Sequence, residues 1–386
     1  MDDTGDLCWL GVNAIILSGV AVPARRASIV EHNRLCIAFP RWISAAVSTL
    51  KQVAEKAGVS VSVASRSLNG HAKTYRISDA TVSRVKEAAD KLDFRPSQTA
   101  RSLRLKKTGL VGVVVPDLSN PFFASISQSI ALSAEAEGYS VIVADSREET
   151  EHEIRLLQQL EDRQVEALVV CPVGTQSTHL QQINEGGTPV VLADRTFPEC
   201  DLVQVTSEHR AGAVKATRLL TAKGHRVIGV LQGLPGTLPN DQRLSGHAEA
   251  LKESGVVLDQ SLIRGNNFTE ASGFDSAKKL LTDRPDITAL FAFSTPNAMG
   301  ALRAANESGR HVPQDLSIVG FDDSPYADLM NVPLTTVCQD VDKIGQIAAD
   351  LALRAVGSSK GRKRKTRHDV KTRVIVRNSI SSVRDS

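Results

Sequence analysis

The chain has 386 residues, 41% hydrophobic and 4% aromatic, enough apolar material for two or three packed domains. Its net charge of +3 is unevenly spread: residues 48–107 hold 13 Lys and Arg against 5 Asp and Glu, whereas residues 108–359 hold 19 against 32. A basic segment on an acidic body indicates contact with a polyanion. The sequence contains no run of about 18 uncharged apolar residues, which excludes a membrane span.

The first 47 residues show no pattern that continues into the basic segment. Residues 7–23 are apolar, but the acidic residues before them argue against a secretory signal, which needs positive charge there. We expect residues 1–47 to be an unassigned extension, either disordered or added by the choice of start site. Val47 is then an alternative start.

No pattern typical of a catalytic or metal site is present. The five cysteines have no paired spacing, which suits a reducing compartment rather than a disulfide framework or a zinc site. The sequence lacks Gly-x-Gly-x-x-Gly after its first core strand, His-Glu-x-x-His, Gly-x-Ser-x-Gly and Cys-x-x-Cys. We therefore expect no enzymatic activity and no cofactor.

A helix-turn-helix pattern opens the basic segment. Thr49 and Gln52 fit a capping box that starts a helix, and Gly58 ends it because glycine takes the left-handed turn at little cost. Ser60 can cap a second helix over 61–68, which is helix-turn-helix spacing. A third helix over 78–92 would pack behind both. This pattern on a basic segment predicts a DNA-binding head. The alternative is a small three-helix bundle that does not bind DNA.

A break at Phe94-Arg95-Pro96-Ser97 separates this region from a short basic stretch over 97–107. So short a helix is marginal alone and is expected to fold only against a surface. The alternative is a flexible basic linker. The sequence thus predicts an all-α head over 48–96, followed by a hinge over 97–107.

From Gly109 onward, strands and helices alternate, which predicts an α/β core of two parallel-sheet lobes with a cleft between them. We assign it to residues 108–380, with a tail over 381–386. The predicted strands are 110–115, 141–144, 167–170, 189–192, 227–231, 262–264, 288–293, 317–319 and 374–376, and the predicted helices are 126–137, 151–163, 177–184, 210–223, 242–254, 273–282 and 298–308. Ligands of such sheets bind beyond the carboxyl ends of the strands.

The residues also resemble a known family. The motifs that carry the resemblance are Thr49-Leu50-Lys51-Gln52-Val53-Ala54-Glu55-Lys56-Ala57-Gly58-Val59-Ser60, Ala64-Ser65-Arg66-Ser67-Leu68-Asn69-Gly70, Phe94-Arg95-Pro96-Ser97, Ala100-Arg101-Ser102-Leu103, Ser119-Asn120-Pro121-Phe122-Phe123, Gly224-His225-Arg226, Arg243-Leu244-Ser245-Gly246, Gly320-Phe321-Asp322-Asp323 and Pro333-Leu334-Thr335-Thr336-Val337. Together they resemble the lactose/galactose repressor (LacI/GalR) family over about residues 48–380. The resemblance implies a periplasmic-binding-protein-like core and a cytoplasmic, nucleoid-associated homodimeric repressor.

The resemblance implies that each head places its second helix in the major groove of a near-palindromic double-stranded operator. The implied DNA contacts are Thr49, Leu50, Ser60, Val61, Ser62, Ser65, Arg66, Asn69, Ala100, Arg101 and Leu103. Arg66 can donate two hydrogen bonds to a guanine edge; the alternative is a phosphate contact. Leu103 is expected to wedge between bases at the operator centre, the alternative being packing against the head.

We expect the cleft to hold a small-molecule effector. A carbohydrate-like molecule is our prediction, and a nucleobase is the alternative. The implied contacts are Asn120, Phe122, Phe123, Asp194, Arg195, Arg243, Ser294 and Asp322. A sugar hydroxyl can accept from Arg and donate to Asp, and a sugar face can stack on a phenyl ring. Plain core packing remains open for the phenylalanines, and a surface ion pair for Asp194 with Arg195.

The sequence departs from the family pattern near the cleft. The resemblance therefore predicts the fold but not the identity of the effector. Ser294-Thr295 stands where the family often has Asn-Asp, Ser207-Glu208 where it often has Asp-Asn, and the expected loop over 233–241 carries two prolines. The basic segment 360–367 is either a second DNA contact or a solvated loop before the last strand. The alternative function is a solute-binding protein of sugar uptake without a DNA role.

Overall fold

The computed structural model describes residues 48–95, 107–357 and 366–383. Its contacts divide the chain into two units, with the boundary after Arg95, and each unit is described by itself. We call residues 48–95 the head and residues 107–383 the core. Of the hinge expected over 97–107, only Lys107 is described. Most of the basic segment 360–367 also lies outside the described residues.

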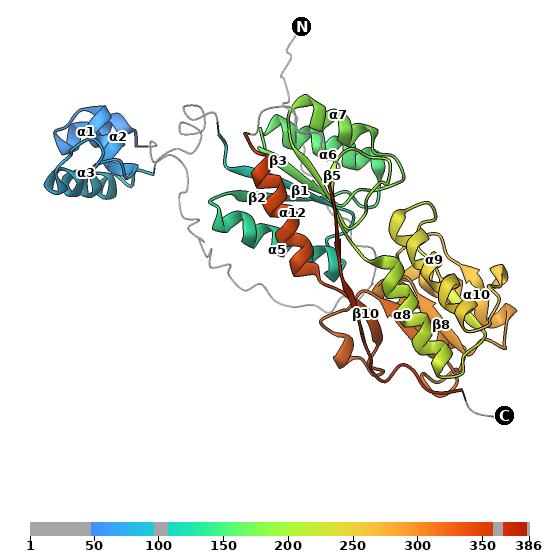
Figure 1. Cartoon of the computed structure of the whole chain (residues 1–386). Helices are drawn as coiled ribbons and strands as arrows, with labels where there is room; N and C mark the ends of the chain where they lie inside the picture. Colours follow the sequence, from blue (N-terminus) through green and yellow to red (C-terminus); the bar gives the residue numbers. More distant parts are fainter. Residues whose placement is uncertain (1–47, 96–106, 358–365, 384–386) are drawn as a thin grey trace, which may run out of the picture. The chain divides into compact units, whose positions relative to one another are not determined.

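The head consists of three helices, α1 (Leu50–Ala57), α2 (Val61–Leu68) and α3 (Asp79–Lys91), shown in blue in Figure 1. The predicted capping box is present: Gln52 N donates to Thr49 Oγ1 at 3.3 Å, and Thr49 N donates to Gln52 Oε1 at 2.7 Å. Gly58 ends α1 in the left-handed conformation, with φ of 65°. Ser60 caps α2 as predicted.

Small side chains form the head's hydrophobic centre, which lets three short helices pack closely. The buried residues are Val53, Ala54, Ala57, Ala64, Val85, Ala88 and Ala89. They come from the apolar stripes of all three helices, so each helix buries one face and leaves the opposite face exposed. α2 is thereby held by α1 and α3 with its outer face free.

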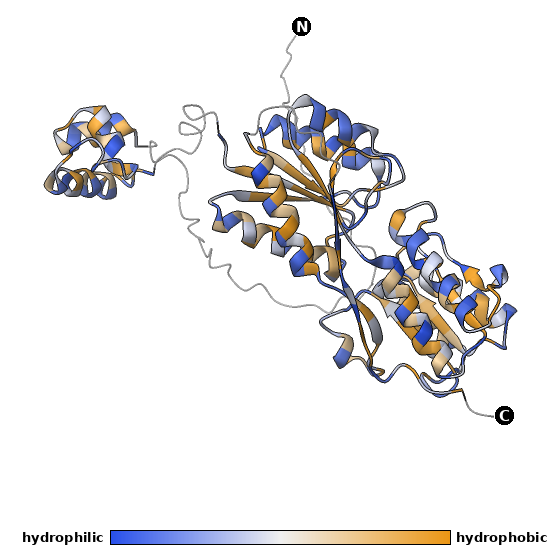
Figure 2. Ribbon diagram, in the orientation of Figure 1, coloured by the Kyte–Doolittle hydropathy of each residue, from blue (hydrophilic) through white to orange (hydrophobic). Residues whose placement is uncertain are grey.

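The core has two lobes, each built on a six-stranded sheet with helices on both faces (Figures 1 and 2). Lobe 1 has the strand order β11-β5-β4-β3-β1-β2, and lobe 2 the order β12-β10-β9-β8-β6-β7. The strands are β1 (Leu110–Val115), β2 (Ser140–Asp145), β3 (Ala167–Val170), β4 (Val190–Ala193), β5 (Val203–Ser207), β6 (Ile228–Leu231), β7 (Ile263–Arg264), β8 (Ala289–Ala292), β9 (Ser317–Phe321), β10 (Thr335–Gln339), β11 (Arg367–Val370) and β12 (Thr372–Ile375). All recorded pairings are parallel except that of β12 with β10.

Helices cover both faces of each sheet. Those packed on lobe 1 are α5 (Pro121–Ala136), α6 (Thr150–Asp162), α7 (Thr178–Gly186) and α12 (Val341–Ala355), and those on lobe 2 are α8 (His209–Ala222), α9 (Leu238–Glu253), α10 (Glu270–Asp283) and α11 (Thr295–Glu307). The short 3-10 helices η1 (Gln260–Leu262) and η2 (Ala327–Leu329) complete lobe 2. None of the helices in the described ranges is long and apolar enough to cross a membrane.

The chain passes between the lobes at three crossovers. It leaves lobe 1 between β5 and α8, returns between β10 and α12, and leaves again between β11 and β12. Figure 1 shows the last crossover as a long red strand pair beside α12 and α8. Because every crossover joins the end of one regular element to the start of another, a change in the angle between the lobes must be absorbed there.

The two-lobed α/β architecture confirms the predicted fold class, with differences at element level. α5 begins at Pro121 rather than Ile126, because Asn120 caps it and proline suits a first turn. α9 begins at Leu238 rather than Gln242, so the segment predicted as a loop over 233–241 is helical from Leu238 onward. The sequence prediction omitted β5, β10, β11 and α12, the elements that flank the crossovers.

Candidate DNA-binding and effector-binding sites

The free face of α2 presents Val61, Ser62 and Arg66 to solvent, and 46% of the Val61 surface is exposed. Ser60 begins the helix, so the first two of these residues lie in its first turn, and Arg66 follows one turn later. An exposed apolar residue, a hydroxyl and a guanidinium on one face can contact a thymine methyl, a range of bases and a guanine edge. The face is suited to the major groove.

Arg66 is held by an aromatic partner that the sequence did not predict. Its guanidinium carbon lies 3.8 Å from the centre of the Tyr75 ring, which comes from the loop between α2 and α3 and is itself 51% exposed. The positive charge over the ring face is attracted by the aromatic quadrupole. The contact orders a long side chain on a surface that would otherwise leave it free.

The other predicted head residues have structural bonds of their own. Asn69 Nδ2 donates to Ser65 O at 2.7 Å and lies 3.3 Å from Ser65 Oγ, and both residues are half-buried. The hydroxyls of Thr49 and Ser60 accept from cap amides, and Leu50 packs on the head's centre. Ala100, Arg101 and Leu103 lie outside the described residues.

All eight predicted effector residues line one small pocket between the lobes, which we call the inner pocket. Its lining comprises Asn120, Phe122, Phe123, Asp194, Arg195, Pro239, Arg243, Phe268, Ser294 and Asp322. Its volume is about 20 Å³, room for about one water molecule. The residues are therefore brought together, but in this arrangement they close on one another.

Phe122 and Phe123 stand in the first turn of α5, with ring centres 5.1 Å apart in an edge-to-face arrangement. Asn120 sets this turn by accepting from Phe122 N at 3.1 Å. Both rings belong to the hydrophobic centre of lobe 1 as well as to the pocket lining. Both phenylalanines therefore pack in the hydrophobic centre of lobe 1 and line the pocket at the same time.

Asp194 and Arg195 are each only 4% exposed, so the interpretation as a surface ion pair is wrong. Arg195 instead donates to both oxygens of Glu148, at 2.6 and 2.7 Å. Its guanidinium carbon also lies 5.2 Å from the centre of the Phe268 ring, which belongs to lobe 2. Glu148 was not predicted as part of the site, because it is brought there only by the fold.

Arg243 is the cation at the centre of the inner pocket. Its Nη2 lies 3.8 Å from Asp322 Oδ1, its guanidinium carbon lies 3.8 Å from the centre of the Phe321 ring, and Nη1 donates to Phe293 O. Asp322 also accepts from Gln339 Nε2 at 2.5 Å. Ser294 is less available, since its hydroxyl caps α11 and donates to neighbouring oxygens.

Burial changes the acidity of these groups. It raises the pKa of the Asp194 carboxyl from 3.8 to about 7; Arg243 opposes the shift, and the negative Asp322 adds to it. Burial also raises the pKa of Asp322 and lowers that of Arg243. His209, whose Nδ1 lies 3.3 Å from Arg243 Nη2, has a pKa well below its usual value because of burial and that cation.

Buried polar atoms of two pocket residues, Asp194 and Arg243, and of Gln339, which donates to the pocket residue Asp322, lack hydrogen-bond partners in the part of the chain that the structure describes. Among the described residues, none forms a hydrogen bond with Asp194 Oδ1, Arg243 Nε or Gln339 Oε1. Leaving such groups unpaired is costly, so they are where polar groups of a ligand would gain most. One acceptor from an acid, one donor from a guanidinium and flanking phenyl rings are the groups that recognise a hydroxylated ring.

Comparisons with known proteins found matches to both the head and the core. Residues 49–97 match the lacI family of bacterial regulatory proteins, and residues 217–380 match the periplasmic binding protein-like domain. Catabolite control protein A of Priestia megaterium is 31% identical over 304 residues, which cover 78% of this chain and 91% of that protein. The match at the head favours a regulator over the alternative of an uptake protein.

Two solved structures extend the likeness over most of the chain. The complex of the transcriptional regulator CelR with cellobiose has a TM-score of 0.65 at 31% identity, covering 86% of this chain and 99% of that one. The lac repressor dimer bound to operator and an anti-inducer has a TM-score of 0.76 at 26% identity, covering 87% and 99%. The chain therefore belongs to the lacI family of DNA-binding transcription regulators.

Proposed function

We propose that the protein is a homodimeric transcriptional repressor whose operator affinity is set by a carbohydrate-like effector bound between the lobes of its core. One observation supports the proposal above all: the same chain carries two sites. The head has a free recognition face on α2, and the core has a buried, charged pocket with unpartnered polar atoms. The lac repressor structure, a dimer on its operator, supports the dimer and a near-palindromic site.

In this proposal, Arg66 reads a guanine edge through two hydrogen bonds, and Tyr75 holds its guanidinium in position. Val61 contacts a thymine methyl, Ser62 adapts to the base it meets, and the caps of α1 and α2 approach phosphates. We assign residues 48–96 to the DNA-binding domain and residues 97–107 to the hinge. Leu103 of the hinge wedges into the central base step of the operator.

The effector is held by both lobes. Phe122, Phe123 and Asp194 come from lobe 1, whereas Arg243 and Asp322 come from lobe 2. A sugar hydroxyl that donates to Asp194 and accepts from Arg243 satisfies atoms on opposite sides of the cleft at once. The cellobiose complex of CelR supports a carbohydrate rather than a nucleobase.

Control of DNA binding follows from the crossovers. Gln339 ends β10 at one crossover and donates to Asp322, and His209 begins α8 at another and lies beside Arg243. An effector that fits one lobe angle better shifts the population toward it. That angle sets the spacing of the two hinges in the dimer, and hinges at the wrong spacing cannot fold together in the minor groove.

The remaining assignments complete the proposal. The effector-binding and dimerisation domain spans 108–380 with a tail over 381–386, and residues 1–47 are an unassigned extension. The protein acts in the cytoplasm on nucleoid DNA and carries out no catalysis. Its relatives and structural neighbours are named as regulators, which supports this assignment.

One experiment tests the whole proposal. DNA bound by the purified full-length protein is selected from a random pool, and the selection is repeated in the presence of individual sugars and nucleosides. We expect a near-palindromic consensus whose recovery changes with a sugar. A protein that shows no salt-sensitive binding to any duplex would exclude the proposal, because phosphate contacts are its first requirement.

A further inference from the structure

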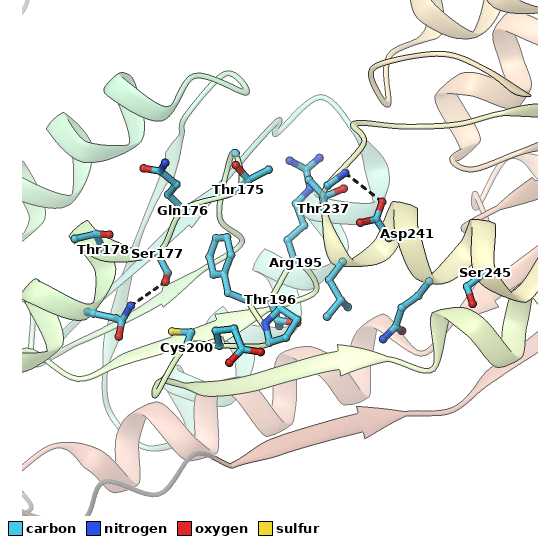
Figure 3. Close-up of a pocket in the computed structure, with 18 residues that line it drawn as sticks. Thr175, Gln176, Ser177, Thr178, Arg195, Thr196, Cys200, Thr237, Asp241 and Ser245 are labelled. Atoms are coloured by element: carbon cyan, nitrogen blue, oxygen red, sulfur yellow. Dashed lines mark hydrogen bonds between the residues drawn. The ribbon is translucent and has the colours of Figure 1, made fainter.

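A second and much larger cavity lies between the lobes, next to the inner pocket. We call it the outer cavity; its volume is about 750 Å³. Two of its wall segments, 174–181 and 195–200, follow the carboxyl ends of β3 and β4 in lobe 1, and the third, 236–245, forms the start of α9 in lobe 2 (Figure 3). This volume falls in the range of small-molecule sites, roughly 300–1,000 Å³.

Neutral polar side chains are the largest group in the lining of the outer cavity, which also contains the carboxylates of Glu199 and Asp241 and a few apolar side chains. Hydroxyls and amides come from Thr175, Gln176 and Thr178 in lobe 1 and from Gln242 and Ser245 in lobe 2. The one guanidinium in the lining is already bound to Glu148 through two hydrogen bonds. Neutral donors and acceptors on both walls suit a ligand with many hydroxyls and no charge.

The lobe 1 wall is held in place before any ligand binds. Glu153 is fully buried, and its carboxylate accepts from Val173 N at 2.8 Å and lies 2.8 Å from His179 Nε2. These bonds brace both ends of the segment that carries Thr175 and Gln176. A braced wall loses less conformational freedom when a ligand binds.

Arg195 connects the outer cavity to the inner pocket, since it lines both. The inner pocket, at about 20 Å³, has no room for a whole sugar ring in this arrangement, whereas the outer cavity has room for more than one. At the outer rim, a side-chain carbon added to Gly236 would lie 3.4 Å from Thr175 Cγ2, so the two lobes nearly meet there. The outer cavity is thus bounded by Arg195 on one side and this rim on the other.

We propose that the effector is a neutral saccharide of at least two rings, the first lying against the charged residues that line the inner pocket and the next in the outer cavity. The inference rests on the proposed carbohydrate control of DNA binding. The charged groups of the inner pocket orient the saccharide, and the outer cavity distinguishes longer saccharides from single sugars. Each good hydrogen bond there is worth about 3- to 10-fold in affinity.

The test is calorimetric titration of the full-length protein with glucose and galactose and with cellobiose, maltose and lactose. We expect at least one disaccharide to bind about 10-fold or more tightly than its component monosaccharides. Gln176→Ala and Gln242→Ala should each weaken that disaccharide about 3- to 10-fold and leave monosaccharide affinity and operator binding unchanged. Gln158→Ala, an exposed glutamine on α6 away from the cavity, is the matched control.

The outcomes separate the inference from the proposed function. Equal affinity for mono- and disaccharides, or disaccharide binding that neither glutamine variant weakens, overturns the outer cavity as a subsite but leaves sugar control standing. Binding of no saccharide, with or without binding of a nucleoside such as cytidine, overturns both the carbohydrate assignment and the inference.

Discussion

Asp194 and Asp322 occupy equivalent positions in the two lobes. Asp194 directly follows β4, the fourth strand of lobe 1 counted from the edge strand β2. Asp322 directly follows β9, the fourth strand of lobe 2 counted from the edge strand β7. Each has left-handed backbone, with φ of 61° and 72°, and each donates its amide to the next strand, to Val205 O at 2.8 Å and Val337 O at 2.9 Å. Non-glycine residues rarely adopt this conformation, and it is concentrated at functional sites.

The repeated turn delivers two acids to one buried pocket, with Arg243 between them as the shared cation. Asp322 is the better fixed of the two, because Gln339 donates to the oxygen that faces Arg243. Asp322→Asn keeps the shape and removes the charge. We expect effector affinity to fall by about 10-fold or more, because charge-assisted hydrogen bonds are lost, while operator binding without effector persists.

Effector titration of operator complexes, followed by fluorescence anisotropy, measures this loss. Asp275→Asn, an exposed aspartate on α10 of the same lobe, is the matched control and should respond as the parent protein does. A normal effector response in Asp322→Asn would show that the carboxylate does not hold the ligand.

Asp194 makes the fold sensitive to pH. Burial raises its folded-state pKa to about 7, above the unfolded value of about 3.8, so the folded protein binds the extra proton between these values. The stability contributed by that proton is fully present below about pH 3.8 and is lost progressively as pH rises to about 7. Asp194→Asn carries no titratable group there. Between pH 5 and 8, the parent should lose about 2 to 3 kcal/mol of unfolding free energy relative to this variant.

Urea unfolding of both proteins at several pH values gives the difference directly. Taking the difference cancels groups that titrate in both proteins, such as the histidines. A parent whose stability relative to Asp194→Asn stays constant over this interval would mean that the Asp194 pKa is not raised, and the buried, partly unpartnered environment described for it would be incorrect.

Patterns among residues close together in sequence were sufficient to predict the helices of the head and most helices and strands of the core. The capping box at Thr49, the left-handed Gly58 and the cap at Ser60 depend on residues close together in sequence, and the structure has all three. The positions of the predicted effector residues followed mainly from the resemblance to the repressor family. Local pattern failed at Phe122, where an asparagine cap and a proline begin the helix earlier than its apolar periodicity does.

The missing parts of the site come from distant contacts. Glu148 reaches Arg195 across 47 positions of sequence, and Gln339 reaches Asp322 across 17. Neither position carries a local signal, because each pair forms only when the strands of a sheet are assembled. Glu148 and Arg195 follow β2 and β4, which are separated by β1 and β3, and Gln339 and Asp322 lie at the ends of the neighbouring strands β10 and β9. The strand β11 was missed for the same reason, because its partner strand β5 lies about 160 residues earlier in the chain.

Arg66 should determine operator preference. Arg66→Ala removes a guanidinium from the exposed face of α2, and we expect specific operator affinity to fall about 10- to 100-fold, with effector binding unchanged. Tyr75→Ala should cost about 2- to 5-fold, because it releases the guanidinium without removing it, and Tyr75→Phe should restore the parent value.

Binding to the selected operator and to a scrambled duplex at the same salt concentration separates reading of bases from phosphate contact. Arg84→Ala, an exposed arginine on α3, serves as control, since it should weaken both duplexes alike. An Arg66→Ala protein that also loses affinity equally for both duplexes would assign Arg66 to phosphate.

Close packing of α10 against α11 should make lobe 2 intolerant of a single added methyl group. A side-chain carbon at Gly300 would lie 2.3 Å from Glu270 O and from Phe274 N, both backbone atoms of α10. Backbone cannot rotate away as a side chain can, so Gly300→Ala must push the helices apart, at about 1 to 3 kcal/mol or more. Gly186→Ala, at the end of α7, meets nothing within 4 Å and should be neutral or slightly stabilising. Thermal unfolding of the two variants decides the point, and equal melting temperatures would mean that α10 and α11 do not pack at this distance.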